Sequence, residues 1–455
     1  MDHSSQADGC CCLGSVWQGL TSAPVRLGLL AAGLAVTVVG WGLPQGGETV
    51  AHAANVKLAP IQVGEQDWPW WRGPARNGIA PQGPPAPTSW SATENVVWKV
   101  EVPGKGHGSP TVVGDRVYLT AAEPDREVQS VLCFDRGTGK RIWQSTVHEG
   151  GFTTKGNQKS SLASSSVACD GERLYATFLN REAVFVSCLD LSGALLWQTR
   201  MTDFALHQGF AASPALYGDL VFATADSKGN GLFAALRRDT GEIAWKHERP
   251  KLPNYTSPII LEVAGRPQVL LTGCNLVSSY DPETGKKLWE IPGATEECVT
   301  STVTDGTVVF SSGGYPRDHL AAIAGDGSGK VVWENKSRVY VPSMVIHDGY
   351  LYAVLDAGVA MCWKTSDGTE MWKQRLGGTF SSSLVLAGEA LYATSEEGHT
   401  FVFRATPQGF ESLGENQLGD STFSTPVICG GRVYHRVAHE IDGRRQEFLY
   451  CLGTK

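Results

Sequence analysis

The sequence predicts an all-β fold in which eight repeats of four strands close into a ring, and three observations predict it. A hairpin that ends in tryptophan recurs along the 455-residue chain. A short strand that begins with small residues occurs eight times, and the incomplete repeats at the two ends of the array complement each other. A repeat of about 40–50 residues with strand content is typical of a ring of similar sheets.

The clearest copy of the hairpin is SYDPETGKKLW, Ser279–Trp289. Asp281 can accept hydrogen bonds from N–H groups of its own turn, and Gly285 supplies the positive φ that such a turn needs. Leu288 and Trp289 then begin the next strand. ENVVWKV supplies one further tryptophan without the preceding turn, so the predicted structural tryptophans are Trp98, Trp143, Trp197, Trp245, Trp289, Trp333 and Trp372.

Each repeat opens with a strand that starts in small residues, followed by a Gly/Asp turn and a strand that carries an aromatic residue. The first strands are predicted at 108–113, 163–168, 212–217, 256–261, 300–304, 342–346, 382–386 and 424–428. The seventh repeat, FRATPQGFESL, lacks the tryptophan, and Leu413 is nearest to its place.

The two ends of the array fit one gap. EFLYCLGTK supplies the third strand of the last repeat but no fourth, whereas the strand around Trp98 is a fourth strand with no third. Their pairing closes the ring and removes its open ends. The prediction is therefore an eight-bladed β-propeller of four-stranded antiparallel blades over 96–455, with small residues innermost and tryptophan outermost.

Residues 1–56 stand outside the repeats. Leu27–Leu43 carries no charge and follows Arg26, and Ala51–Ala53 resembles the small-x-small site of an export signal. We predict a leader that is a cleaved export signal, with an uncleaved membrane anchor at 27–43 or a buried helix as alternatives. Cys10–Cys12 precede the apolar stretch, which argues against lipidation of the kind seen in bacterial lipoproteins.

Residues 57–95 are rich in proline and tryptophan. Proline at this density is incompatible with a central strand or a helix. Four tryptophans are too apolar for a free linker, so we predict an extended segment held across the body by Trp68, Trp70, Trp71 and Trp90.

Charge and cysteine usage exclude several classes. A net charge of −8 with a pI near 5.8 disfavours a nucleic-acid partner. Cys133, Cys188, Cys362 and Cys451 occupy one repeat position, and neighbouring blades should hold them beyond the limit of about 7 Å between Cα atoms for a disulfide. No CxxC or paired Cys/His spacing predicts a metal site. We expect a monomer without metal.

Together, these residues resemble the quinoprotein-type eight-bladed propeller, whose repeats carry a small residue followed by D-x-x-T-G-x-x-x-W. The match is close at Ser279–Trp289, Cys133–Trp143 and Ala235–Trp245. DWPWWRGPARNGIAP and QRLGGTFSSS also look like an exported bacterial subgroup described as PQQ-binding-like. The resemblance implies one of two relatives: PQQ-dependent alcohol dehydrogenases, or the non-enzymatic BamB scaffold of the outer-membrane barrel assembly machine.

The resemblance to the dehydrogenases implies PQQ over the axis, with calcium held by Glu, Asn and Asp and often a disulfide of adjacent cysteines. Outside Cys10–Cys12 the chain has no adjacent cysteines, and no acidic cluster has the spacing of a calcium site. We therefore predict no cofactor and no enzyme activity, but an exported scaffold in the periplasm or cell envelope that binds an unknown protein partner. A PQQ-dependent dehydrogenase and a carbohydrate or small-ligand binding propeller remain the alternatives.

Strand order predicts two unlike faces. The first-to-second and third-to-fourth turns are short, whereas the other connections, including 121–129, 146–162, 202–211, 313–319 and 437–446, are longer and varied. Function is concentrated on such loops. Aligning the first strands predicts a ring at the axis of His107, Leu162, Ala211, Tyr255, Val299, Tyr340, Phe380 and Phe423, either a binding mouth or a hydrophobic plug. Further candidate ligand or partner contacts around it are Lys159, His207, Tyr315, Arg317 and Arg375.

Overall fold

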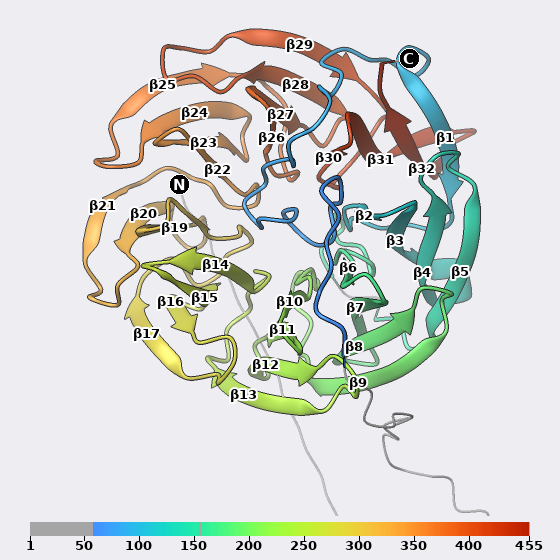
Figure 1. Ribbon diagram of the computed structural model, residues 1–455, viewed down its shortest axis with the longest axis horizontal. Coiled ribbons are helices and arrows are strands. Elements are labelled where there is room, and N and C mark those ends of the chain that lie inside the picture. The colour runs from blue at the N-terminus through green and yellow to red at the C-terminus, as the bar shows by residue number, and fades with distance from the viewer. Residues whose placement is uncertain (1–57, 154–155, 455) are drawn as a thin grey trace, which may run out of the picture. The chain divides into compact units, whose positions relative to one another are not determined.

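The computed structural model describes residues 58–153 and 156–454, and its strands form eight antiparallel sheets of four strands each (Figure 1). The predicted eight-bladed all-β architecture is confirmed. Within these ranges the helical content is one 3₁₀ turn, η1 (Pro124–Arg126), and no described helix is long and apolar enough to cross a membrane. The predicted leader, with its candidate anchor at 27–43, lies outside the described residues.

The blades follow one another in chain order, and each runs from the axis to the rim (Figure 1). The first four blades are β2 (Thr111–Val113), β3 (Arg116–Glu123), β4 (Val128–Asp135) and β5 (Arg141–Glu149); β6 (Ala168–Cys169), β7 (Arg173–Asn180), β8 (Ala183–Asp190) and β9 (Leu195–Asp203); β10 (Ala215–Tyr217), β11 (Leu220–Asp226), β12 (Gly231–Arg237) and β13 (Ile243–Arg249); and β14 (Ile259–Val263), β15 (Arg266–Gly273), β16 (Leu276–Tyr280) and β17 (Lys287–Pro292). The next three are β18 (Val303–Thr304), β19 (Val308–Gly313), β20 (His319–Ala324) and β21 (Val331–Asn335); β22 (Val345–His347), β23 (Tyr350–Leu355), β24 (Val359–Lys364) and β25 (Glu370–Arg375); and β26 (Val385–Ala387), β27 (Ala390–Thr394), β28 (His399–Arg404) and β29 (Ser412–Gln417).

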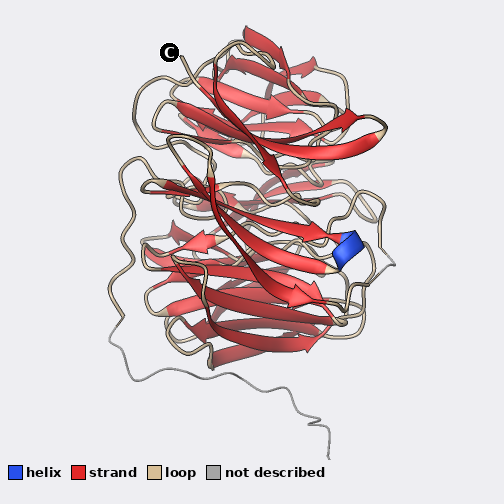
Figure 2. Ribbon diagram, turned by 90° about the vertical axis from the view of Figure 1, so that its right-hand side faces the viewer, coloured by secondary structure: helices blue, strands red, loops and turns tan. Residues whose placement is uncertain are grey.

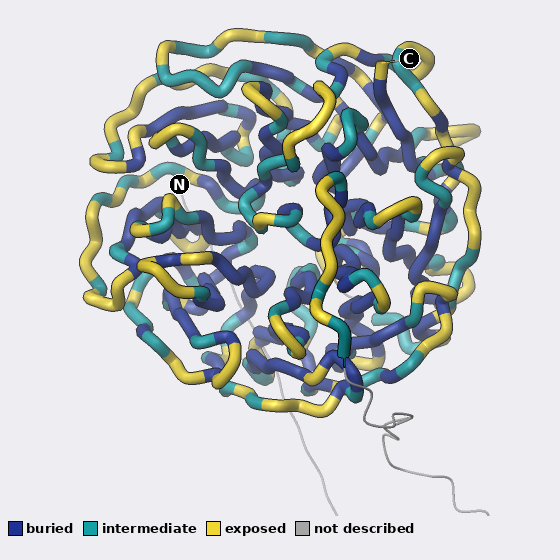
Figure 3. The backbone as a smooth tube through the Cα atoms, in the orientation of Figure 1, coloured by how far each residue is buried: buried dark blue, intermediate teal, exposed yellow. Residues whose placement is uncertain are grey.

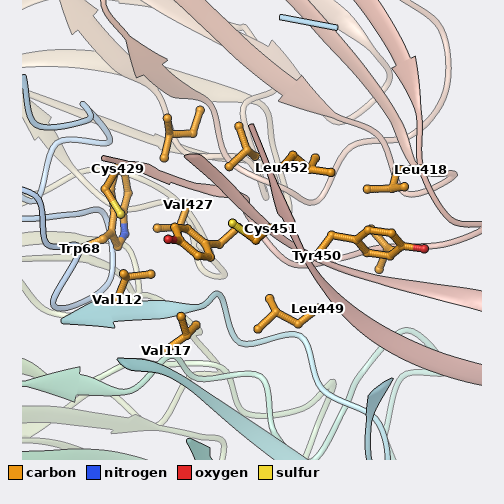
Figure 4. Close-up of a cluster of buried hydrophobic side chains, with 14 of the residues drawn as sticks. Trp68, Val112, Val117, Leu418, Val427, Cys429, Leu449, Tyr450, Cys451 and Leu452 are labelled. Carbon is orange, nitrogen blue, oxygen red and sulfur yellow. The ribbon is translucent and has the colours of Figure 1, made fainter. Parts of the chain in front are cut away.

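The eighth blade closes the ring. It combines β30 (Val427–Cys429), β31 (Arg432–Ile441) and β32 (Arg444–Leu452) from the C-terminal end with β1 (Val96–Val102) as its outermost strand. Trp98 pairs with Cys451 and Val100 with Leu449 in this antiparallel register. Side chains of this blade form a buried cluster with Trp68 and β2 (Figure 4). The closure predicted from the two incomplete repeats is confirmed.

The repeat tryptophans lie on the outermost strands and pair across the sheet with a small residue of the third strand. These pairs include Cys133 with Trp143, Ala235 with Trp245 and Cys362 with Trp372. The eight described cysteines are free and buried, and burial raises the pKa of Cys133 to about 12. These thiols act as small apolar side chains.

Each tryptophan also packs on the turn of the following blade. A Cβ added to Gly285 would lie 2.5 Å from the Trp245 ring, so the turn glycine makes room for the preceding blade's indole as well as adopting φ +71°. The indole N–H of Trp143 donates to Leu191 O at 3.0 Å, and that of Trp197 donates to Arg238 O at 3.0 Å. The D-x-x-T-G turn is thus a docking surface between blades.

The seventh blade, which lacks its own tryptophan, receives one from the N-terminal segment. Gly414, rather than the predicted Leu413, stands opposite Val402 where the other blades carry tryptophan. Trp90 stacks on Tyr392 at 6.3 Å between ring centroids, matching the 6.3 Å of Tyr352 and Trp372 in the sixth blade. A Cβ on Gly414 would lie 2.3 Å from Thr88 O, so the absent side chain makes room for this segment.

Residues 58–95, hereafter the strap, run in an extended course over the face that carries the short turns (Figures 1 and 2). Trp68 forms a β-bridge with Val112 of the first blade, and Ile79 forms one with Leu386 of the seventh. Arg72 donates from Nη1 to Leu384 O at 2.8 Å. Burial lowers the pKa of Arg72 to about 9, and its hydrogen bonds go to carbonyl oxygens. Exposed and buried stretches alternate along the strap (Figure 3).

The opposite face, hereafter the loop face, carries the connections between blades. The predicted long connection 437–446 is mostly strand, because β31 extends to Ile441 and β32 starts at Arg444. The connection at 121–129 is likewise reduced to 124–127, which includes η1. The longer segments on this face are therefore those that lead from one blade to the next, such as 204–214 and 336–344.

Candidate binding site

The small residues that open each repeat form a ring of hydroxyl groups around the axis instead of extending the inner strands. The backbone N–H of one member donates to the side-chain oxygen of the next, for example from Ser109 to Ser166 Oγ at 2.9 Å and from Ser166 to Ser213 Oγ at 2.9 Å. We call this set the hydroxyl ring: Ser109, Ser166, Ser213, Ser257, Ser301, Ser343, Ser383 and Thr425. The first strands consequently begin later than predicted.

The strap closes the axis on its own side. Seven of the eight links in the hydroxyl ring are made within the described chain, and the eighth would join Ser257 to Ser301. At that position the Ser301 hydroxyl instead accepts a hydrogen bond from Trp71 Nε1 at 2.7 Å. Trp71 therefore reaches the axis from the strap face.

Above Trp71 lies a cavity of about 370 Å³, hereafter the axial cavity. Its wall includes most of the hydroxyl ring, and above that ring stand the residues two positions earlier in each blade. These are His107, Ser164, Ala211, Tyr255, Val299, Val341, Ser381 and Phe423. Asn157, Lys159, Gln208, Phe210 and Tyr340, from connections on the loop face, complete the rim.

Five of the ten predicted contact residues line this cavity. His107 packs against Phe423, with 4.5 Å between the ring centroids. Lys159, Tyr255 and Tyr340, which precede the second, fourth and sixth blades, also line the cavity.

His207 lies beside the cavity and is linked to its lining through Glu297, an acid that the sequence pattern does not single out. Its Nε2 is 3.3 Å from Glu297 Oε1, and Tyr340 Oη donates to Glu297 Oε2 at 3.3 Å. Glu297 is only 4% exposed. The carboxylate thus joins the 204–214 connection to the 336–344 connection.

Four predicted residues lie elsewhere. Phe380 is buried in the core against Phe401, with 6.2 Å between centroids. Tyr315 is exposed, Arg317 lines a separate depression with His319, and Arg375 ends the outer strand β25. The predicted alignment was shifted in the second, sixth and seventh blades, where Ser164, Val341 and Ser381 replace Leu162, Tyr340 and Phe380 in the ring.

The lining of the cavity has few charged groups. None of its lining residues carries a carboxylate, and the single lysine, Lys159, has its Nζ 2.6 Å from Glu396 Oε2. Burial, with the nearby charge of Lys105, holds the pKa of His107 well below its ordinary value, which makes the imidazole neutral near pH 7. Burial also raises the pKa of Tyr255, so this phenol keeps its proton.

Two polar atoms of lining residues have no hydrogen-bond partner of normal geometry in the described chain: His107 Nε2 and Tyr255 Oη, although the Gln208 backbone lies close to the phenol. A buried donor or acceptor without a partner costs about 1–3 kcal/mol. His107 belongs to the first blade and Tyr255 to the fourth, so these unpaired groups stand on different sides of the cavity, and both favour a polar ligand. Among the described residues, no group of three or more aspartates, glutamates, histidines or cysteines is placed to hold a metal ion.

Comparison with known proteins agrees with this fold. The family model described as outer membrane protein assembly factor BamB matches residues 127–327 and 316–407. BamB of Burkholderia pseudomallei is 26% identical over 352 residues, which cover 68% of this chain and 87% of that protein. A polyvinylalcohol dehydrogenase of a Pseudomonas species is also 26% identical, over 42% of this chain and 30% of its own length.

Solved structures show the same architecture. A europium-containing methanol dehydrogenase superposes with a TM-score of 0.62 at 11% identity, covering 86% of this chain and 98% of its own. BamB from Moraxella catarrhalis gives a TM-score of 0.56 at 14% identity, covering 79% and 97%. BamB and dehydrogenase structures therefore share the propeller fold. Because the BamB family model matches more than half of the sequence, the chain belongs to the family of outer membrane protein assembly factor BamB.

Proposed function

We propose that this protein is a non-catalytic, exported propeller that binds a protein partner in the cell envelope through its loop face. The observation that carries this proposal is the inequality of the two faces. The strap covers the axis on one side, with Trp71 bonded to the hydroxyl ring, while varied connections and the axial cavity occupy the other. Membership of a family named for outer-membrane protein assembly supports a scaffold role and an envelope location.

The chemistry of the cavity supports a non-catalytic role. Calcium takes about six to eight oxygen ligands, several from carboxylates. The cavity wall offers none, and its one ammonium group is already paired with Glu396. These residues do not fit PQQ with calcium, and we derive no step through that cofactor.

The partner can be sought with matched double variants of the full chain. Lys228→Glu with Tyr315→Ala changes two exposed side chains on the loop face. Lys140→Glu with Leu191→Ala makes the same kinds of change at two exposed positions in short turns of the opposite face, which the strap crosses. Cross-linking and co-purification from envelope extracts should lose the partner in the first variant and keep it in the second.

The opposite pattern, or equal retention by both variants with unchanged melting temperatures, would place the partner surface elsewhere. The dehydrogenase alternative has a separate test: titration with PQQ and Ca²⁺ while absorbance and the reduction of an electron acceptor by alcohols are followed. Stoichiometric binding with turnover would overturn the non-catalytic assignment.

A further inference from the structure

The wall of the axial cavity combines aromatic rings with clustered hydroxyl and amide groups. Phe210, Tyr340 and Phe423 offer aromatic rings, and Trp71 adds an indole at the strap end. Between them lie serine hydroxyls and the amides of Asn157 and Gln208. Aromatic faces suit the C–H face of a ring, and clustered hydroxyls and amides suit a ligand edge rich in hydroxyl groups.

The hydroxyl ring has unused donor capacity. Each member of the hydroxyl ring that lines the cavity accepts one backbone N–H, as Ser213 Oγ does from Ser166 at 2.9 Å. A serine or threonine hydroxyl has one O–H to donate besides its acceptor lone pairs. The six ring members on the cavity wall have no hydroxyl-donated bond to a described protein acceptor. Their O–H groups are thus available to a ligand.

His107 and Tyr255 point independently to the same ligand chemistry. Each lines the cavity and has a polar atom without a hydrogen-bond partner in the described chain, and Tyr255 is only 9% exposed. Neighbouring atoms cover both polar atoms, so a ligand reaches them after a small movement of the side chains. A ligand that carries several hydroxyl groups can donate to one atom and accept from the other, because each hydroxyl does both.

The side chains that line the cavity disfavour an ionised ligand. The wall has no carboxylate to hold a cation, and Lys159 has its charge offset by Glu396. Lys105 lies behind the wall, where its Nζ donates to Ser160 O at 3.0 Å, and it does not line the cavity. The wall itself offers an anion no unpaired cationic group, and burying an anion without one is costly. The cavity, at about 370 Å³, falls at the small end of ligand pockets, which span about 300–1,000 Å³.

We propose that the axial cavity binds an uncharged oligosaccharide, with one or two sugar rings inside the cavity. The sugar rings stack on Phe423 and Tyr340, and their hydroxyls bond to His107 and Tyr255 and to the hydroxyl ring. This site goes beyond partner binding by the loops, which does not require the cavity to be filled.

The test uses the full chain and three uncharged disaccharides: maltose, cellobiose and N,N′-diacetylchitobiose. Saturation-transfer NMR and calorimetry should detect binding of at least one. Ala211→Trp fills the cavity without removing any hydrogen bond of the Ala211 side chain, and should weaken binding by about tenfold or more, equivalent to about 1.4 kcal/mol. Ala205→Trp, an exposed position in the same connection, is the matched control and should leave affinity unchanged.

Tyr255→Phe is a second test of the same site, and it applies even if Ala211→Trp does not fold. It removes only the unpartnered hydroxyl, so stability should be equal or higher while affinity falls several-fold, a combination that a purely structural role would not produce. Maltobionate, the carboxylate counterpart of maltose, should bind at least about tenfold more weakly than maltose if maltose is bound.

Absence of binding by all three disaccharides, unchanged affinity in Ala211→Trp, or preference for maltobionate would overturn the proposal. Any of these results leaves the partner assay intact, because that assay changes residues outside the cavity wall. Conversely, loss of the partner surface would not alter disaccharide affinity.

Discussion

At the scale of single residues, the repeat glycine serves two purposes that the turn alone does not explain. Gly285 has φ +71°, and the Trp245 ring lies where its Cβ would be. Gly218 has φ +52°, but no atom lies within 4 Å of the place that its Cβ would occupy. Comparing these two glycines separates the cost of a positive φ from the cost of packing a side chain against the neighbouring blade.

Gly285→Ala should therefore cost more than Gly218→Ala. Each places a non-glycine residue in the left-handed region, at about 1–2 kcal/mol. Gly285→Ala adds an overlap with the indole, and overpacking typically costs a further 1–3 kcal/mol or so, roughly doubling the loss. Urea unfolding of both variants measures the difference. Equal losses would show that the indole yields without cost.

Another residue-scale prediction concerns pH. His435 is fully buried, neither ring nitrogen has a partner in the described chain, and burial lowers its pKa to about 4. Below its ordinary pKa of about 6.5 the unfolded chain binds a proton that the folded chain does not, so stability falls as pH drops from 6.5 towards 4.

His435→Phe should remove the contribution of this histidine to the pH dependence. At pH 5 the histidine costs about 2 kcal/mol relative to pH 7, from the separation of the two pKa values. The variant should lose correspondingly less stability between these pH values in urea titrations. His399→Phe, at an exposed histidine, is the control and should follow the wild-type slope. A parallel slope for His435→Phe would contradict the neutral buried state.

At the scale of elements, the strap is part of the seventh blade. Trp90 is 4% exposed, its backbone N–H donates to Asn416 Oδ1 at 2.7 Å, and its ring stacks on Tyr392. This arrangement supplies the aromatic packing that the other blades obtain from their own fourth strand. The strap therefore contributes to the stability of the propeller as well as covering one face.

Trp90→Ala should destabilise the protein by about 3–5 kcal/mol, the usual range for such a truncation in a core. Protease cleavage within 79–95 should accelerate at the same time, because the strap loses its anchor on β29. Trp71→Ala is the comparison: this half-buried ring lines the cavity, and its loss should cost less. Thermal unfolding and timed proteolysis measure both effects. Similar losses in the two variants would contradict the role of Trp90 in the seventh blade.

Sequence reasoning was most successful where a pattern repeats. Trp98 and Cys451 pair as the two incomplete repeats predict, because eight copies fix the meaning of each position. The ring of residues predicted at the axis was harder to align. SSS at 164–166 and at 381–383 allows several registers, and adjacent serines do not distinguish them. Trp71 could not be assigned to the cavity, because its place depends on the path of the strap and no repeat fixes that path.

At the scale of the whole molecule, the ring depends on β1 holding the C-terminal blade. Glu101 and Phe448 are cross-strand partners at this closure, and they are far apart in sequence. A disulfide there would restrict the unfolded chain over nearly the whole propeller. Ile441 and Arg444, in the same blade, are also partners but close only a two-residue turn.

The double substitution Glu101→Cys with Phe448→Cys should therefore stabilise the oxidised protein far more than Ile441→Cys with Arg444→Cys. Loop-closure entropy predicts about 5 kcal/mol for a loop of hundreds of residues and much less for the short turn, before any native strain is subtracted. Melting temperatures of each variant with and without reductant isolate the effect of the bond, since the loss of the Phe448 side chain is common to both states. Equal gains in the two variants would mean that the unfolded ends stay close together, or that native strain in the closure bond offsets its entropic gain. A large gain confined to the closure pair would show that joining β1 to β32 restricts the unfolded chain over nearly the whole propeller, as closure of the ring by its two ends predicts.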